Sequence, residues 1–204
     1  MIAIIDYGVG NLFSLMCSFS AIGETAVVTR DPDEIRFAEK LVLPGVGAFG
    51  DAAEKLRRSG LADVLIRKAA NGTPVLGICL GMQLLFDRSY EYGEHQGLGL
   101  IRGEIRPIKD VIDSTLKIPH IGWNPLIFTR PSPLLKYINE GDCVYFVHSY
   151  YAVCDNTVAV ADYSAPLTAM VQSGNVYGCQ FHPEKSGDVG LNILRAFCET
   201  EVSA

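Results

Sequence analysis

The stretch Thr73-Pro-Val-Leu-Gly-Ile-Cys-Leu-Gly-Met-Gln-Leu-Leu-Phe86 decides the fold that this sequence predicts. An apolar run after a proline is typical of a buried strand, and Leu84, Leu85 and Phe86 fit the buried face of a following helix. Between them, Gly77-Ile-Cys-Leu-Gly81 has the form of the Gly-x-Ser-x-Gly nucleophile elbow, with sulfur in place of oxygen. Glycines suit such a sharp and crowded turn because they have no β-carbon. We therefore expect a strand, a tight turn that carries Cys79, and a helix.

Cys79 would lie in the first turn of that helix. Unpaired N–H groups and the positive end of the helix dipole favour a thiolate there, which makes the sulfur a ready nucleophile. The alternative is a small core residue, the usual role of a free cysteine. Its place between two glycines, a strand and a helix favours the catalytic interpretation.

The first half of the chain alternates short apolar strands with helices. This order is typical of a three-layer α/β fold, a mostly parallel sheet with helices on both faces. Ligands of such sheets bind beyond the carboxyl ends of the strands, so the glycine loops at 8–10 and 45–47 should meet Cys79 there. The expected strands are 2–6, 25–29, 40–43 and the one before Cys79; the expected helices are 12–22, a short one from Asp31, 51–58 and 61–70.

The second half has a different pattern. A polar loop is expected from Asp87 to Gly99, and an amphipathic helix from Gly187 to Glu199 closes the chain. Between them, successive strands without helices predict an antiparallel extension of the sheet, with a hairpin turn at 173–175. The expected strands are 100–108, 118–129, 143–153, 158–163, 168–172 and 176–181.

Length and composition limit the possible functions. A chain of 204 residues predicts a single domain, 1–204, with no linker. The net charge of −6 without a basic cluster argues against nucleic acid, and no apolar run is long enough to span a membrane. Six cysteines without Cys-x-x-Cys pairs, and no targeting segment before the first strand, predict a reducing cytoplasm and no metal site. We expect no cofactor, because no phosphate loop or nucleotide fingerprint is present.

A base for the cysteine is predicted at Phe181-His-Pro-Glu184. His182 follows an apolar strand, and Glu184 can point to the same side of an extended segment. A carboxylate on one imidazole nitrogen fixes the tautomer and leaves the other nitrogen for the thiol, as in a catalytic triad. From this segment alone, a strand-capping histidine and a solvated glutamate are equally consistent. Together with Cys79, the segment favours a catalytic triad.

Gly77-Ile-Cys-Leu-Gly-Met-Gln83 together with His182-Pro-Glu184 resembles the class I, triad-type glutamine amidotransferases. Within that family, the chain is similar to the glutaminase subunits of imidazole glycerol phosphate synthases. Further segments carry this resemblance along the whole chain: 6–11, 44–51, 97–101, 119–124, 145–150 and 181–187. One departure is Ile121, where methionine is expected, and it bears only on a partner contact.

The resemblance implies a role for each matching residue. Cys79 would attack the side-chain amide of glutamine, with His182 as base and then acid and Glu184 as its orienting group. The other implied residues are Val46 and Leu80 for an oxyanion hole of backbone N–H groups, and Gly47, Gln83, His148, Ser149 and Tyr150 for glutamine binding.

The resemblance also implies a heterodimer partner, a (β/α)8-barrel cyclase subunit. This cyclase would use the ammonia to make imidazole glycerol phosphate and an aminoimidazole carboxamide ribotide in histidine biosynthesis. Asn11, Trp123 and Lys185 are implied near the partner, although a lone tryptophan is more often a core residue. The alternatives are the glutaminase of another synthase, such as that for anthranilate or pyridoxal phosphate, a non-enzymatic regulator, and a cysteine-dependent stress protein. The segments at 6–11 and 119–124 argue against the first, and His182 with Glu184 against the others.

Overall fold

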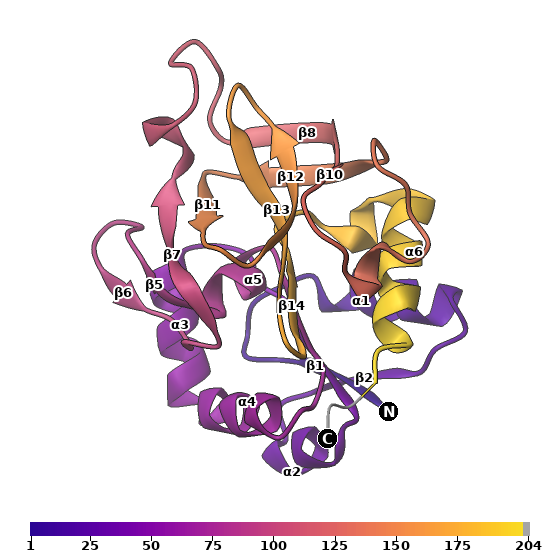
Figure 1. Ribbon diagram of the computed structural model, residues 1–204. Helices are drawn as coiled ribbons and strands as arrows, with labels where there is room; N and C mark the ends of the chain where they lie inside the picture. The colour runs from indigo at the N-terminus through magenta and orange to yellow at the C-terminus, as the bar shows by residue number, and fades with distance from the viewer. Residues whose placement is uncertain (202–204) are drawn as a thin grey trace.

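A mixed eight-stranded sheet forms the centre of the protein in a computed structural model that describes residues 1–201 (Figure 1). Its strand order is β2-β1-β3-β4-β14-β13-β12-β9. The strands from β2 to β14 run parallel to one another, and those from β14 to β9 pair antiparallel. Their bounds are β1 Ile2–Ile5, β2 Ala26–Thr29, β3 Lys40–Leu43, β4 Val75–Ile78, β9 Ile127–Phe128, β12 Thr157–Asp162, β13 Pro166–Ser173 and β14 Val176–Cys179. The predicted α/β class is therefore correct, including its antiparallel extension.

Helices cover both faces of this sheet. The longer helices are α1 Leu12–Ala21, α3 Phe49–Arg58, α4 Leu61–Ala70 and α6 Gly187–Cys198, and the shorter ones are α2 Pro32–Phe37 and α5 Leu80–Leu84. Apolar side chains of α2, α3 and α4 pack with one face, while Phe19 of α1 and Leu194 of α6 pack with the other. Side chains of a strand alternate between its faces, so Ala3 and Ile5 join the first cluster and Ile4 the second. A strand buried on both sides must be apolar throughout, as the sequence shows.

The turn between β4 and α5 is the sharpest part of the fold. A β-carbon on Gly81 would lie 1.8 Å from the carbonyl oxygen of Leu43, and one on Gly77 would lie 2.7 Å from the backbone of Met82. Both glycines are thus required because backbone passes against backbone. Cys79 itself takes the positive φ of 53°, a conformation that costs a residue with a side chain on the order of 1–3 kcal/mol.

Two expectations about the middle of the chain are wrong. Phe86 does not belong to the helix, because α5 ends at Leu84 and Phe86 begins a strand. The region 87–99, expected to be a loop, contains strand residues. Here β5 Phe86–Ser89 lies between β6 His95–Gln96 and β7 Ile101–Pro107 in a second sheet of order β11-β7-β5-β6, with β11 Tyr150–Val153 at its other edge. An apolar run shorter than a few turns does not distinguish helix from strand.

The expected strands 118–129 and 143–153 are each divided. β8 His120–Pro125 pairs with β10 Cys143–His148 in a two-stranded sheet, while β9 and β11 join the other two sheets. Ser149 separates β10 from β11. Single 3-10 turns are η1 Ile108–Asp110, η2 Pro133–Leu135 and η3 Pro183–Lys185. The small sheets therefore extend the protein beside the central sheet rather than widening it, and they form one side of the site.

Candidate active site

Cys79 lies at the end of β4, at the centre of the eight-stranded sheet. Its backbone N–H donates to the carbonyl of Cys179, the last residue of the neighbouring strand β14, over 2.7 Å. The side chain is largely buried, but it lines a cavity of about 400 Å³. The strained turn thus presents the sulfur to a cavity of the size that binds small metabolites.

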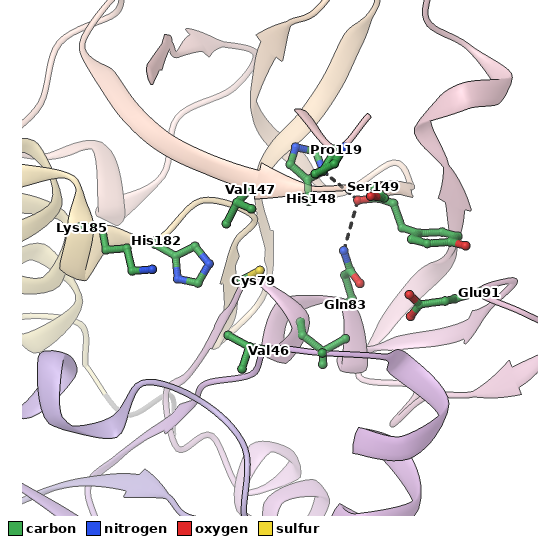
Figure 2. A pocket seen from close by; sticks show the side chains of 13 residues that line it. Val46, Cys79, Gln83, Glu91, Pro119, Val147, His148, Ser149, His182 and Lys185 are labelled. Carbon is green, nitrogen blue, oxygen red and sulfur yellow. Dashed lines mark hydrogen bonds between the residues drawn. The ribbon is translucent and has the colours of Figure 1, made fainter. Parts of the chain in front are cut away.

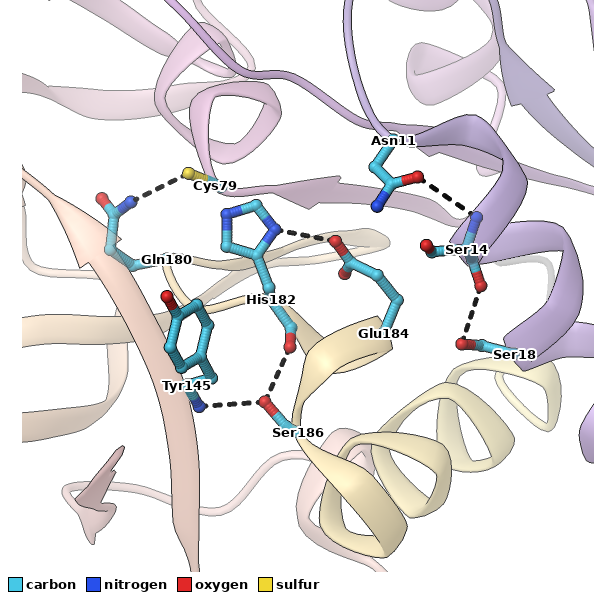
Figure 3. A network of polar contacts seen from close by, with 9 residues as sticks. All are labelled: Asn11, Ser14, Ser18, Cys79, Tyr145, Gln180, His182, Glu184 and Ser186. Atoms are coloured by element: carbon cyan, nitrogen blue, oxygen red, sulfur yellow. Dashed lines mark hydrogen bonds and ion pairs between the residues drawn. The ribbon is translucent and has the colours of Figure 1, made fainter. Parts of the chain in front are cut away.

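His182 and Glu184 lie in the segment that follows β14, after Gln180 and Phe181 (Figure 3). Nδ1 of His182 lies 2.7 Å from Oε1 of Glu184, and the other ring nitrogen points toward Cys79. The backbone N–H of His182 donates to the carbonyl of Tyr145, and its carbonyl accepts from the hydroxyl of Ser186. These bonds hold the imidazole between the sulfur and the carboxylate.

The charges beside His182 control its protonation. Burial by itself would lower the pKa of His182, but hydrogen bonds and negative charges of Cys79 and Glu184 outweigh it and raise the pKa to about 9. The imidazole therefore favours its protonated form at neutral pH and can donate a proton. Glu184 is itself almost fully buried, and its Oε2 has no hydrogen-bond partner in the described part of the chain. Among the hydrogen-bond partners of Glu184 in the described residues, only His182 can carry a positive charge that balances the carboxylate.

The predicted glutamine-binding residues surround the cavity beside this triad (Figure 2). Those that line it are Gly47, Gln83, His148, Ser149 and Tyr150. Nε2 of Gln83 donates to the carbonyl of Tyr150 over 3.2 Å and to Oε1 of Gln180 over 2.9 Å. Because these bonds use both N–H groups of the carboxamide, Oε1 of Gln83 is the atom that remains for a ligand.

His148 supports the cavity wall rather than acting as a base. Burial lowers its pKa to about 3, so it is neutral near pH 7. Its Nδ1 lies 2.8 Å from the carbonyl of Tyr150, which can only accept, and so Nδ1 carries the proton. Its Nε2 then accepts from Nδ1 of His120, 3.0 Å away. His120 is therefore a buried support of the wall.

The backbone groups predicted for an oxyanion hole lie on the same cavity. Leu80 is the first residue of α5, and the first N–H groups of a helix have no partner within it. Val46 lines the cavity from the loop after β3, between Gly45 and Gly47. Gly47 has a φ of +99°, whereas a β-carbon on Gly45 would lie 2.8 Å from the backbone nitrogen of Gly81. Gly47 is therefore needed for the conformation of the turn, and Gly45 for the close contact with α5.

Two polar residues of the site were missed in the sequence. Glu91 lines the cavity, and its Oε2 accepts the N–H of Phe49 at the start of α3 over 2.6 Å. Burial raises the pKa of Glu91 above its usual range. Gln180 is fully buried and lies against Cys79. Glu91 lies in a polar segment with no motif, so the sequence gives no indication of it. Gln180 directly precedes the Phe-His-Pro-Glu segment, and a polar residue in an otherwise apolar strand could have indicated a place in the site.

The residues implied for partner contact are accessible. Trp123 is 55% exposed on β8, so the core alternative is wrong, and its ring meets that of Tyr145 on β10 at 6.0 Å between centroids. Nζ of Lys185 lies 5.8 Å from the centroid of the Tyr145 ring, and Lys185 also lines the cavity. Asn11 is exposed and caps α1, accepting from the N–H of Ser14.

The comparisons with known proteins agree with this site. The Glutamine amidotransferase class-I family profile matches residues 3–200. The chain is 49% identical over 201 residues to imidazole glycerol phosphate synthase subunit HisH of Lactococcus lactis subsp. lactis, covering 97% of this chain and 98% of that protein. HisH of Geobacillus sp. strain WCH70 is 49% identical over 202 residues, covering 97% and 95%. A crystal structure of a glutamine amidotransferase shares the fold, with a TM-score of 0.75 and 16% identity over 97% of this chain and 100% of that one.

The chain belongs to the class-I glutamine amidotransferases. Within that class it belongs to the HisH subunits of imidazole glycerol phosphate synthase. The prediction of a glutaminase subunit of this synthase in histidine biosynthesis is thereby confirmed. None of the helices in residues 1–201 has the length and apolar character needed to cross a membrane.

The raised pKa of His182 predicts a titration that depends on Glu184. We expect His182 to titrate near pH 9 rather than 6.5, and Glu184→Gln to lower its pKa by at least about one unit, because a neighbouring anion is removed. The charge on His182 also stabilises the fold fully below pH 6.5 and loses this effect as pH rises through about 9. NMR titration of the imidazole, assigned with His182→Asn, measures the shift.

The matched control is Glu199→Gln, an exposed carboxylate that pairs with Lys136. It should leave the titration of His182 unchanged. A wild-type pKa near 6.5, or an equal response to both variants, would show that Glu184 does not govern His182.

Proposed function

We propose that Cys79, His182 and Glu184 hydrolyse the side-chain amide of glutamine to glutamate and ammonia. The observation that carries this proposal is the alignment of the Cys79 sulfur, the His182 imidazole and the buried Glu184 carboxylate beside a cavity of about 400 Å³. A non-enzymatic regulator would not require a strained cysteine beside a protonated histidine, so these features favour an enzyme.

Each proposed step uses one of these groups. The thiolate of Cys79 attacks the amide carbon, and its C–S bond forms as the carbonyl electrons move to oxygen. His182 then gives its proton to the leaving nitrogen, which departs as ammonia and leaves a thioester. A water molecule, deprotonated by His182, attacks the thioester and releases glutamate and the thiolate. Glu184 keeps the imidazole oriented through both halves of the reaction.

The developing oxyanion would bind between the N–H groups of Val46 and Leu80. Leu80 supports this role because it follows the nucleophile at a helix start, where N–H groups point outward. Val46 supports it because it lines the same cavity as Cys79 and Leu80. Loss of one such donor costs about 100- to 1,000-fold in rate in comparable sites.

The α-amino end of glutamine would bind at the opposite end of the cavity. Oε1 of Gln83 is free to accept, and Glu91 places a carboxylate on the same wall (Figure 2). A substrate ammonium would make charge-assisted hydrogen bonds with both groups. Backbone N–H groups near Gly47 and Ser149 are the candidates for its carboxylate.

We also propose that the chain acts as one amidotransferase domain in the cytoplasm and delivers ammonia to a (β/α)8-barrel cyclase subunit. The names of its relatives, which are synthase subunits, support a partner of this kind. Trp123, Lys185 and Asn11 would lie at the contact. Trp123 and Lys185 share Tyr145 beside the cavity, so a partner on this surface would meet the released ammonia directly.

Replacement of the nucleophile should separate the production of ammonia from its use. In the complex with a cyclase subunit, we expect Cys79→Ser to lower glutamine-dependent synthesis at least about 1,000-fold. Synthesis from added ammonium salt should stay near wild type, because it needs no thioester. Cys17→Ser, at an exposed cysteine, is the control. Equal loss of both activities in a folded complex would contradict the role of Cys79.

Removal of the charge at Glu91 should weaken substrate binding. We expect Glu91→Gln to raise the KM for glutamine about 10- to 100-fold, the effect of one charge-assisted hydrogen bond, with kcat within a few-fold of wild type. Glu94→Gln, at an exposed carboxylate paired with Arg88, is the control. The assignment fails if KM is unchanged while kcat falls.

The partner surface can be tested with the sole tryptophan. Trp123 fluorescence should change when the cyclase binds, because an exposed indole becomes buried. Trp123→Ala should raise the Kd of the complex by about 10-fold or more, as interfacial aromatic residues do. Phe37→Ala is the matched control, since Phe37 is 83% exposed on α2, a helix at the opposite end of the molecule from β8 (Figure 1). Equal Kd values for both variants would place the interface elsewhere.

A further inference from the structure

Gln180 is a buried polar side chain that the proposed mechanism does not use. It follows β14, where its backbone N–H donates to the carbonyl of Ala169 in β13. The residue has no exposed surface. A buried carboxamide costs free energy unless its groups are hydrogen-bonded, so its contacts identify what it does.

The orientation of this carboxamide is fixed by Gln83. Nε2 of Gln83 donates to Oε1 of Gln180 over 2.9 Å and to the carbonyl of Tyr150, which cannot donate. Gln83 must therefore present its N–H groups, and Gln180 must present its oxygen to them. The Nε2 of Gln180 consequently faces the other way, 3.8 Å from the sulfur of Cys79.

Gln180 and His182 contact the sulfur from different directions (Figure 3). Both residues come from the segment after β14, with Phe181 between them. His182 is held by Glu184 on the far side of its ring, and Gln180 by Gln83 on the far side of its amide. Sulfur therefore has a second donor in addition to the imidazole.

We propose that Gln180 is a further catalytic residue, whose side-chain N–H donates to the sulfur of Cys79 and stabilises its thiolate. An N–H donor stabilises an anion more than a neutral thiol, so it favours the form that attacks. The same bond stabilises the sulfur when it leaves during thioester hydrolysis. The inference deepens the proposed function, because it rests on Cys79 as the nucleophile.

The test measures the pH dependence of Cys79 alkylation by iodoacetamide in the full-length chain. The modified Cys79 peptide is quantified by mass spectrometry, because Cys17 and Cys143 are exposed and also react. Gln180→Met keeps the length of the side chain and removes the donor, while Gln180→Glu places a carboxylate beside the sulfur. We expect the alkylation midpoint to rise by about one pH unit in the first variant and by more in the second.

Control variants separate this role from packing. Gln172→Glu, in the β13–β14 hairpin, should leave the midpoint unchanged. Gln83→Met removes the bond that orients Gln180 but keeps its N–H, so it should shift the midpoint less than Gln180→Met. An unchanged alkylation midpoint in Gln180→Met, or an equal shift in Gln83→Met, would overturn the proposal. If Gln180→Glu does not fold, the result for Gln180→Met alone is the test.

The alkylation result is independent of the glutaminase assay. The kcat/KM for glutamine should fall about 10- to 100-fold in Gln180→Met, the effect of one donor to a charged group. If Cys79→Ser retained glutaminase activity, the proposed function would fail while the alkylation midpoints still reported the contact. If only the midpoints failed to move, the nucleophile would stand and the role of Gln180 would be wrong.

Discussion

The close contact between α5 and the ends of β3 and β4 is the constraint on which the rest of the site depends. Gly77 and Gly81 let backbone pass against backbone, and Gly45 does the same from the opposite loop. This contact brings the start of α5 against the loop that contains Val46. The distance between the sulfur and the facing N–H groups is therefore set by backbone packing, which is stiffer than side-chain packing.

The interior beside this contact holds a set of buried polar groups that are joined to one another. Gln83 donates to Gln180, Gln83 and His148 both donate to the carbonyl of Tyr150, and His120 extends the set toward β8. Each group is costly to bury alone, and the shared bonds offset that cost. A set of side chains joined in this way has few alternative arrangements, so the cavity wall is held in one shape.

The sequence predicted the central sheet correctly and pointed to Cys79, His182 and Glu184 as candidates because both predictions depend on local patterns. Strand and helix periodicity, Gly-x-Cys-x-Gly and His-x-Glu are each contained within a few residues. The roles of Glu91 and His120 depend on contacts between distant segments, such as Glu91 with Phe49, and no local pattern reports those. Phe86 was assigned to a helix for the related reason that the second sheet, formed with residues up to 153, decides its conformation.

The site is built from two parts of the protein that differ in the free energy of local unfolding. Cys79 and the segment of His182 end β4 and β14, adjacent strands with three further sheet strands on either side of the pair. The wall of His148 and Tyr150 belongs to the smaller sheets, whose edges have fewer partners. Free energies of local opening follow such differences, so we expect the wall to exchange its hydrogens sooner than β4 and β14. A wall that opens separately in this way leaves the spacing of the Cys79 sulfur and the His182 imidazole unchanged.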